Sequence, residues 1–163
     1  MQIRPATVDD ASSISELNVE VQALHAQALP RIFKPPSSGA FPPEEVARWF
    51  DDARNHVFLA CEGESAVGYI WARLLSLPET SYRYGMEVAY INHLAVQSAC
   101  RRRGVGRALI GQVLGLARER GVSMVQLDVW PFNEQAKAFF RRQGFTVFNE
   151  RMWIGLDRLD AMG

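Results

Sequence analysis

The sequence holds little cysteine, no excess of either charge and no long apolar run. With 2 cysteines in 163 residues, Cys61 and Cys100 are too few for a disulfide framework. The 18 basic and 18 acidic residues cancel, which leaves no overall field for nucleic acid or an anionic membrane. No apolar stretch approaches the roughly 18 residues that cross a bilayer, and Met1–Pro5 shows no apolar signal segment. These absences predict a soluble, cytoplasmic protein without nucleic-acid or membrane partners.

The apolar content, at 48% of the residues, is enough for one sizeable core, so we predict a single domain over residues 1–163. Hydrophobic periodicity and turn residues predict the order strand, two helices, three strands, helix, strand, helix and further strands, which is an α/β domain with a mixed sheet. The expected strands are a start at Ile3, His56–Cys61, Ala66–Leu75, Val88–Val96, Val122–Trp130 and two short strands within Phe145–Leu156. The expected helices follow a capping box at Thr7–Asp10, span Pro43–Arg54, run from Gly104 to Gly121, and follow Asn133, while Pro30–Pro43 and Pro78–Gly85 are expected to be loops.

The cations are concentrated in one place, at Arg101-Arg102-Arg103-Gly104-Val105-Gly106 with Arg107. This run lies between an apolar strand and a helix, where free backbone N–H groups and a partial positive charge favour anions. Glycines let the backbone approach a phosphate closely. The dinucleotide motif needs a third glycine, and the kinase-type loop needs Gly-Lys-Ser/Thr, so neither fits. A solvated surface run or a nucleic-acid contact is the alternative interpretation of the arginines.

The run has the form Arg/Gln-x-x-Gly-x-Gly/Ala and resembles the phosphate loop of the GNAT family of N-acetyltransferases. Tyr90–Val96 resembles the strand that precedes this loop in the family. Asn133–Phe140, followed by Gln143-Gly144-Phe145, resembles its downstream helix. The resemblance implies a GNAT-like mixed, mostly antiparallel sheet of six to seven strands, flanked by about four helices, with splayed central strands. It also implies acetyl-CoA (or CoA) as the cofactor and no metal.

The resemblance also implies which residues hold the cofactor. Backbone groups of Leu94, Ala95 and Val96 would pair with the pantetheine arm. The pyrophosphate would lie in the loop and the first helical turn, formed by Arg101, Arg102, Arg103, Gly104, Val105, Gly106, Arg107 and Ala108. Asn133, Ala136, Phe139 and Phe140 would flank the far end of the arm, although Asn133 is first a helix cap and Phe139 suits a core.

The predicted reaction transfers an acetyl group from acetyl-CoA to a primary amine by direct attack in a ternary complex. A lysine-type amine has a pKa of about 10.4, so a general base is needed at neutral pH. Glu87 is the first candidate for the base, ahead of Tyr90, His93 and Asp128. Simple alternation puts Glu87 and His93 on one face of their strand, and a bulge would break that parity. The backbone N–H of Val96 is the expected oxyanion donor.

The family's usual tyrosine acid is replaced by Phe140, which cannot donate a proton. Water, Tyr82 or Tyr84 would then protonate the thiolate, or the chain is a non-catalytic acyl-CoA-binding or sensing domain. The acceptor has no signature in the sequence, and a small molecule or a peptide amine remains possible. Phe33, Phe41 and Trp49 are candidates for an apolar acceptor pocket, with core packing as the alternative. A homodimer is possible from the resemblance alone.

Overall fold

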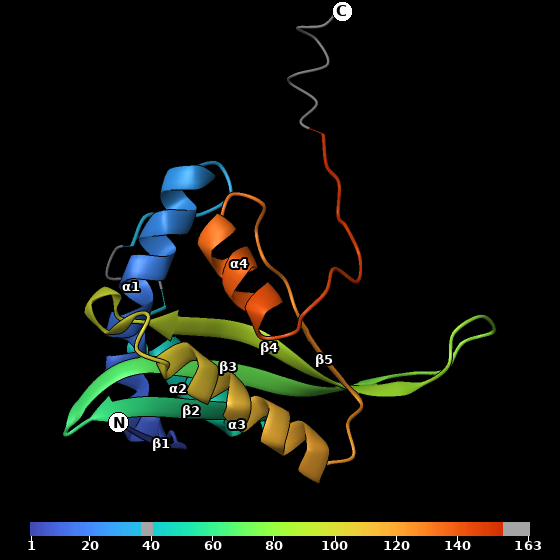
Figure 1. Ribbon diagram of the computed structural model, residues 1–163, viewed down its shortest axis with the longest axis horizontal. Helices are drawn as coiled ribbons and strands as arrows, with labels where there is room; N and C mark the ends of the chain where they lie inside the picture. The colour runs from blue at the N-terminus through green and yellow to red at the C-terminus, as the bar shows by residue number, and fades with distance from the viewer. Residues whose placement is uncertain (37–40, 155–163) are drawn as a thin grey trace, which may run out of the picture. The chain divides into compact units, whose positions relative to one another are not determined.

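The computed structural model describes residues 1–36 and 41–154, and Figure 1 shows the helices and strands they form. The strands are β1 (Gln2–Pro5), β2 (Asn55–Glu62), β3 (Ser65–Leu77), β4 (Met86–Val96) and β5 (Met124–Leu127). The helices are α1 (Ala11–Ala28), α2 (Pro43–Ala47), α3 (Val105–Glu119) and α4 (Glu134–Arg142). Short 3-10 turns are η1 (Val8–Asp10), η2 (Arg48–Asp51) and η3 (Ser98–Cys100).

The strands form one sheet in the order β1-β2-β3-β4-β5. Neighbouring strands are antiparallel except β4 and β5, which are parallel, so the prediction of a mixed, mostly antiparallel sheet is confirmed. The sheet has 5 strands within the described residues, rather than the six to seven expected. Residues 145–154 form no strand, and residues 155–156 lie outside the described part. Their β-forming side chains are not sufficient, because a strand also needs a paired neighbour.

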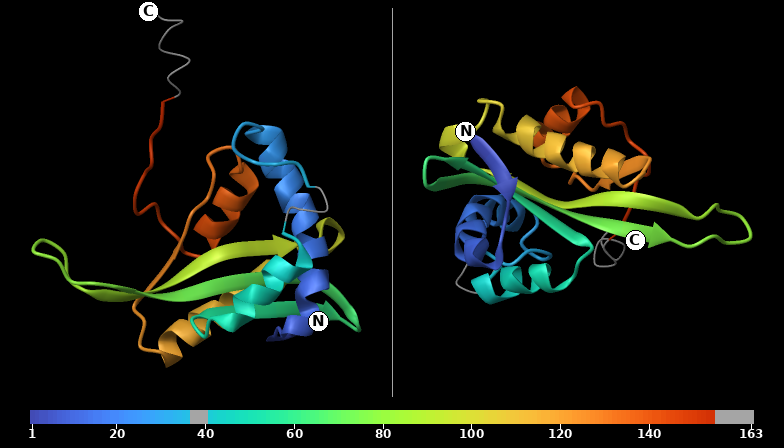
Figure 2. Two further views of the ribbon diagram at one scale, coloured as in Figure 1. Left: turned by 180° about the vertical axis from the view of Figure 1, so that it is seen from behind. Right: turned by 90° about the horizontal axis from the view of Figure 1, so that it is seen from below.

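Helices cover both faces of the sheet, and Figure 2 shows α1 and α2 on one face and α3 on the other. Ile14 of α1 and Val46 of α2 are buried against Leu59 and Tyr69 on the first face. On the second face α3 buries the side of the helix that carries Leu109 and its neighbours at helical spacing, Val105, Ile110, Val113 and Ala117. The predicted helical period from Gly104 to Gly121 is thus confirmed.

Two acidic side chains form local hydrogen bonds next to the first helical segments. The Asp10 carboxylate accepts a hydrogen bond from the backbone N–H of Thr7 at 2.8 Å and pairs with both terminal nitrogens of Arg4, which confirms the capping box. The helix expected over Pro43–Arg54 is wrong at its C-terminal end, because α2 stops at Ala47 and a 3-10 turn follows. Directly after this turn, Asp52 accepts from the backbone N–H of Arg54 at 3.0 Å, and such a local bond competes with helix continuation past Asp51.

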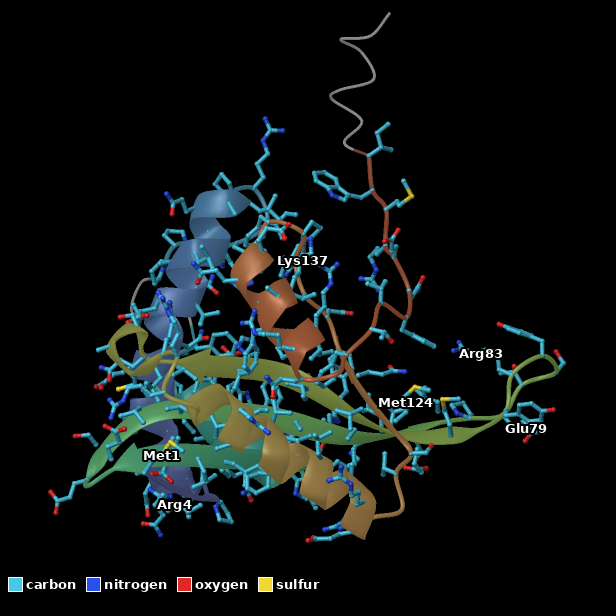
Figure 3. The ribbon with its side chains drawn as sticks, in the orientation of Figure 1. Met1, Arg4, Glu79, Arg83, Met124 and Lys137 are labelled. Carbon is cyan, nitrogen blue, oxygen red and sulfur yellow. The ribbon has the colours of Figure 1, made fainter. Side chains whose placement is uncertain are left out.

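The β3–β4 hairpin extends well past the other strands (Figures 1 and 2). β2 pairs with β3 only as far as Arg73, and β5 pairs with β4 only from Val88 onward, so the outer part of the hairpin has no further strand beside it. Figure 3 shows Glu79 and Arg83 at its tip. The expected loop over Pro78–Gly85 is the turn of this hairpin.

The chain divides into two compact units, Met1–Asp128 and Val129–Gly163. The first contains the whole sheet with α1, α2 and α3, and the second contains α4. The strand expected over Val122–Trp130 is shorter than predicted, because β5 ends at Leu127 where its pairing with β4 ends. Among the described residues, no helix is long and apolar enough to span a membrane. The single domain over 1–163 stays a prediction.

Candidate cofactor and active site

The loop between β4 and α3 has the backbone shape of an anion site. Arg102 and Gly104 both have left-handed backbone angles, with φ of 60° and 86°. Turns of this kind point successive N–H groups into a concavity that suits an anion. Within the described chain, the amides of residues 102–107 meet no backbone acceptor, and the first capped amide of α3 is Ala108, which bonds to the Gly104 carbonyl at 3.0 Å. Several donors are therefore available to a phosphate.

The arginines of this loop divide into two kinds. Arg101 pairs with Glu20 at 2.7 Å, and Arg103 pairs with Glu62 at 2.8 Å. Arg102 and Arg107 are exposed, and within the described residues neither forms an ion pair. The uncompensated cations are thus Arg102 and Arg107, which the consecutive Arg101-Arg102-Arg103 of the sequence did not distinguish.

The last part of β4 has a free edge beside this loop. Pairing of β4 with β5 ends at Ile91 and Leu127, while β4 continues to Val96. The Gln97 N–H bonds to the Val67 carbonyl at 2.9 Å, so by antiparallel alternation the backbone groups of Ala95 point to β3. Those of Leu94 and Val96 then point to the open side. The edge therefore offers Leu94 and Val96 to a ligand that pairs as a strand would.

A glycine on β3 allows that strand to approach the end of β4 closely. Gly68 pairs with Val96, and a β-carbon at Gly68 would lie 2.8 Å from the Ala95 carbonyl oxygen. Real β-carbons do not come so close, so any larger residue at position 68 would displace the end of β4.

A bulge in β4 determines which candidate bases share a face. Trp71 pairs with His93 and Ala72 pairs with Ile91, which leaves Asn92 as the extra residue. His93 and Tyr90 therefore lie on the face of the sheet that α1 and α2 cover, the same face as their pairing partners on β3, Trp71 and Arg73. Glu87 pairs with Ser76 on the other face, where the Ser76 hydroxyl donates to its carboxylate. The bulge thus breaks the simple alternation that would put Glu87 and His93 on one face and Tyr90 on the other.

Distance along β4 separates Glu87 and the hairpin tyrosines from the open edge. At about 3.3 Å per residue, Glu87 lies roughly 20 Å along the strand from Leu94. Tyr82 and Tyr84 are 84% and 87% exposed at the hairpin turn, further still along the same direction. The structure therefore does not bring Glu87, Tyr82 or Tyr84 to the edge formed by Leu94 and Val96.

His93 is half-buried in a cluster of aromatic side chains. Its ring contacts Phe41 at 4.8 Å and Trp71 at 6.1 Å between centroids, and its Nδ1 is 3.5 Å from the Tyr69 hydroxyl. Burial, with a smaller contribution from His25, lowers the pKa of His93 to about 4. His93 is thus neutral near pH 7, as expected of a histidine held under the sheet.

Two buried polar side chains, Asn18 and Tyr69, lie beside the aromatic cluster and are not among the residues predicted from the sequence. The Tyr69 hydroxyl donates to Asn18 Oδ1 at 3.2 Å, and these side chains are 0% and 1% exposed. Trp49 stacks on Trp71 at 4.0 Å and is buried, so it packs in the core. Nothing in the sequence marks Asn18 or Tyr69, because their partners are far away along the chain.

Two further candidates meet where β4 and β5 separate. The Tyr90 hydroxyl donates to the Asp128 carboxylate at 2.8 Å. Tyr90 pairs with Gln126, one position before the last β4–β5 pair, and Asp128 follows the end of β5 directly. A carboxylate is thus held at the point where the two strands stop pairing.

The second unit carries the residues of the downstream helix. Asn133 caps α4, with its Oδ1 accepting from the Ala136 N–H at 3.1 Å. Phe139 and Phe140 lie 5.2 Å apart between ring centroids, and Phe140 also contacts Phe145 at 5.7 Å. The capping prediction is confirmed, while contact of Asn133, Ala136, Phe139 and Phe140 with a cofactor stays a prediction.

Several known proteins that are similar to this chain are named acetyltransferases. The model of the acetyltransferase (GNAT) family matches residues 26–145. The mycothiol acetyltransferase of Segniliparus rotundus is 34% identical over 61% of this chain and 36% of its own length. The aminoglycoside N(6')-acetyltransferase type 1 of Stenotrophomonas maltophilia is 35% identical over 64% of this chain and 68% of its own.

The fold is also found among solved structures. A mutant of the BH1408 protein from Bacillus halodurans superposes with a TM-score of 0.91 at 25% identity, covering 95% of this chain and 99% of that one. This chain spans only 36% of the mycothiol enzyme's length, so the likeness there is to part of a longer protein. The match of the family model to more than half of the residues, on a sheet and loop of the expected form, shows that the chain belongs to the acetyltransferase (GNAT) family.

Proposed function

We propose that this protein is an N-acetyltransferase that moves an acetyl group from acetyl-CoA to a primary amine of a small molecule. The observation that carries the proposal is the loop of residues 102–107, with its unbonded amides and exposed Arg102 and Arg107, next to the open edge of β4. The names of the mycothiol and aminoglycoside relatives support a small-molecule amine as the acceptor. A cytoplasmic location and a homodimer belong to the same proposal, and light scattering would test the dimer.

The residues present fit CoA on physical grounds. The left-handed turns at Arg102 and Gly104 belong to a loop whose amides have no backbone acceptor, and the space beside Gly104 is open, because a β-carbon there would meet no neighbouring protein atom within 4 Å. Each charge-assisted hydrogen bond from Arg102 or Arg107 would contribute about 1.5–3 kcal/mol where water is excluded. The Leu94 backbone groups would bind a pantetheine amide along the edge, because Arg101 already occupies the Val96 carbonyl. The cofactor supplies the thioester that carries the acetyl group.

The acceptor amine must lose a proton. Only about one amine in 10³ is unprotonated at pH 7 when its pKa is near 10.4. We place Asp128 ahead of Glu87 as the group that takes this proton, directly or through water, because Asp128 lies where β4 and β5 part and Glu87 lies on the other face. Tyr90 orients the Asp128 carboxylate.

The remaining steps use few groups of the chain. The Val96 N–H points to the open edge and would stabilise the developing oxyanion. Phe140 has no proton to give, so water would protonate the departing thiolate. The same phenyl side chain favours the alternative function, an acyl-CoA-binding or sensing domain without turnover.

Thiol release from acetyl-CoA, measured with a panel of small amines and aminoglycosides, tests the proposal. We expect turnover with at least one amine and its loss in Gly104→Asp, which adds a negative charge and a β-carbon at a left-handed position. Tight CoA binding without turnover on any amine would favour the sensing domain. Unchanged CoA affinity in Gly104→Asp would contradict the loop assignment.

The base assignment is tested by a matched pair of neutral isosteres. Asp128→Asn should lower kcat about 10²–10⁴-fold at neutral pH, the usual contribution of a general base, and the loss should shrink as pH rises and free amine accumulates. Glu87→Gln removes an equal charge from β4 and should change kcat little. A larger loss in Glu87→Gln would reverse the assignment.

A further inference from the structure

A carboxylate of α1 reaches across to the phosphate loop. Glu20 accepts hydrogen bonds from the Ser98 hydroxyl at 3.0 Å and from Arg101 Nη2 at 2.7 Å, and the Ser98 N–H lies 3.4 Å from the same carboxylate. Ser98 begins η3, and Arg101 is the first residue after it. Glu20 therefore holds both ends of the turn that leads into the loop.

Arg101 carries the connection on to β4. Its Nε donates to the Val96 carbonyl at 2.9 Å, while Nη2 binds Glu20. Protein groups thus occupy the guanidinium on both of these nitrogens, although its place in the motif suggests a phosphate ligand. They also occupy the Val96 carbonyl, which faces the open edge together with the Val96 N–H.

We infer that Glu20 is a positioning residue for CoA, acting through Arg101 to hold the phosphate loop and the end of β4 in one fixed geometry. Without the link, residues 101–104 would have to be ordered when the pyrophosphate binds, and that ordering would weaken affinity. Arg101 then contributes by position, and Arg102 and Arg107 contribute charge. The inference rests on the proposed function, because it assigns a role within that same cofactor site.

The size of the effect follows from the exposure of the pair. The Arg101 and Glu20 side chains are 45% and 42% exposed, so their interaction is partly screened by water. An exposed pair of this kind is worth a factor of up to about five in affinity. Glu20→Gln should therefore raise the Kd for CoA and the KM for acetyl-CoA about three- to fivefold and leave kcat unchanged.

A double-mutant cycle separates this role from a general loss of structure. Arg101→Ala should raise the Kd for CoA by a similar factor, and the double variant should be no worse than the worse single variant. Glu16→Gln removes a carboxylate of the same helix that lines the same hollow as Glu20, and should leave the Kd unchanged. Acetyl-pantetheine lacks the pyrophosphate, so its kcat/KM should fall less in Glu20→Gln than that of acetyl-CoA.

Several results would overturn the inference. They are additive effects of Glu20→Gln and Arg101→Ala, an equal effect of Glu16→Gln, an equal loss with acetyl-pantetheine, or unchanged or tighter CoA binding in Glu20→Gln. Calorimetric titration of the wild type with CoA, done first, separates failure of the proposed function from failure of the Glu20 role. Absence of that binding refutes the proposed function and this inference together, whereas normal binding with a silent Glu20→Gln refutes the inference alone.

Discussion

The phosphate loop and the aromatic face of β4 lie at the same end of that strand but form in different ways. The aromatic face is the side of β4 on which His93 contacts Phe41, Tyr69 and Trp71. The loop uses consecutive residues, left-handed backbone turns and exposed cations such as Arg102. The aromatic face brings Asn18, Tyr69 and His93 together from three separate elements, with Asn18 and Tyr69 fully buried and His93 half-buried. The loop thus depends on local backbone geometry, and the aromatic face depends on long-range packing.

This difference decides what each region tolerates. Exposed donors without protein partners cost the fold little, so changes in the loop should affect ligand affinity more than stability. A buried hydroxyl and amide that bond to each other are part of the folded state, and losing either leaves the other unsatisfied at a cost of about 1–3 kcal/mol. Substitutions in the loop should therefore change mainly the Kd for CoA, and substitutions on the aromatic face should change mainly the free energy of unfolding.

The largest expected effect is on stability, from a substitution of Tyr69 on the aromatic face. Tyr69→Ala should lower the free energy of unfolding by about 3–5 kcal/mol, because it removes a fully buried aromatic side chain and the donor to Asn18. Tyr69→Phe is the matched control, which keeps the ring and should cost only about 1–3 kcal/mol. Urea unfolding measures both. Equal losses in the two variants would show that the hydroxyl, and not ring packing, dominates at this position.

The same division explains what the sequence could predict. The loop is predictable from residues 101–106 because the spacing and glycine positions that define it act locally. The capping box at Thr7–Asp10 and the cap at Asn133 were predictable for the same reason. The face of His93 was not predictable, since a bulge at Asn92 reverses the alternation and depends on pairing with β3. Likewise, the division of the arginines depends on Glu20 and Glu62, which lie far away in the sequence.

Acid should destabilise the aromatic face through His93. Burial and His25 lower its pKa to about 4, against about 6.5 unfolded, so the unfolded chain binds more protons between these values. Stability is therefore full above pH 6.5 and falls by roughly 3 kcal/mol as pH drops to 4. The difference between wild type and His93→Gln in urea unfolding across this range isolates the effect. His56, whose pKa burial also lowers, contributes to both proteins and cancels. Parallel pH curves for the two proteins would contradict the assignment.

Within the loop, neighbouring arginines should behave differently. Arg102→Ala should weaken CoA binding about tenfold or more, since its side chain forms no ion pair among the described residues and is available to phosphate. Arg103→Ala removes the same charge but breaks a pair with Glu62, so the loss should stay below about fivefold. Calorimetric titration with CoA compares them, and neither should shift the unfolding midpoint strongly. A greater loss in Arg103→Ala would remove the distinction between paired and unpaired arginines.

A substitution of Gly104 should change both stability and CoA affinity, because its left-handed backbone geometry lies inside the phosphate loop. A β-carbon there would meet no atom within 4 Å, so Gly104→Ala costs only the strain of a left-handed alanine at φ 86°, about 1–2 kcal/mol. Gly111→Ala is the control, since it also meets nothing within 4 Å but lies inside α3, where alanine stabilises by about 0.5–1 kcal/mol. The two identical substitutions should thus shift the unfolding free energy in opposite directions. CoA affinity should fall only in Gly104→Ala, because relaxing the strain turns the loop amides away from the phosphate. Stabilisation in both variants would show that residue 104 does not need its left-handed geometry.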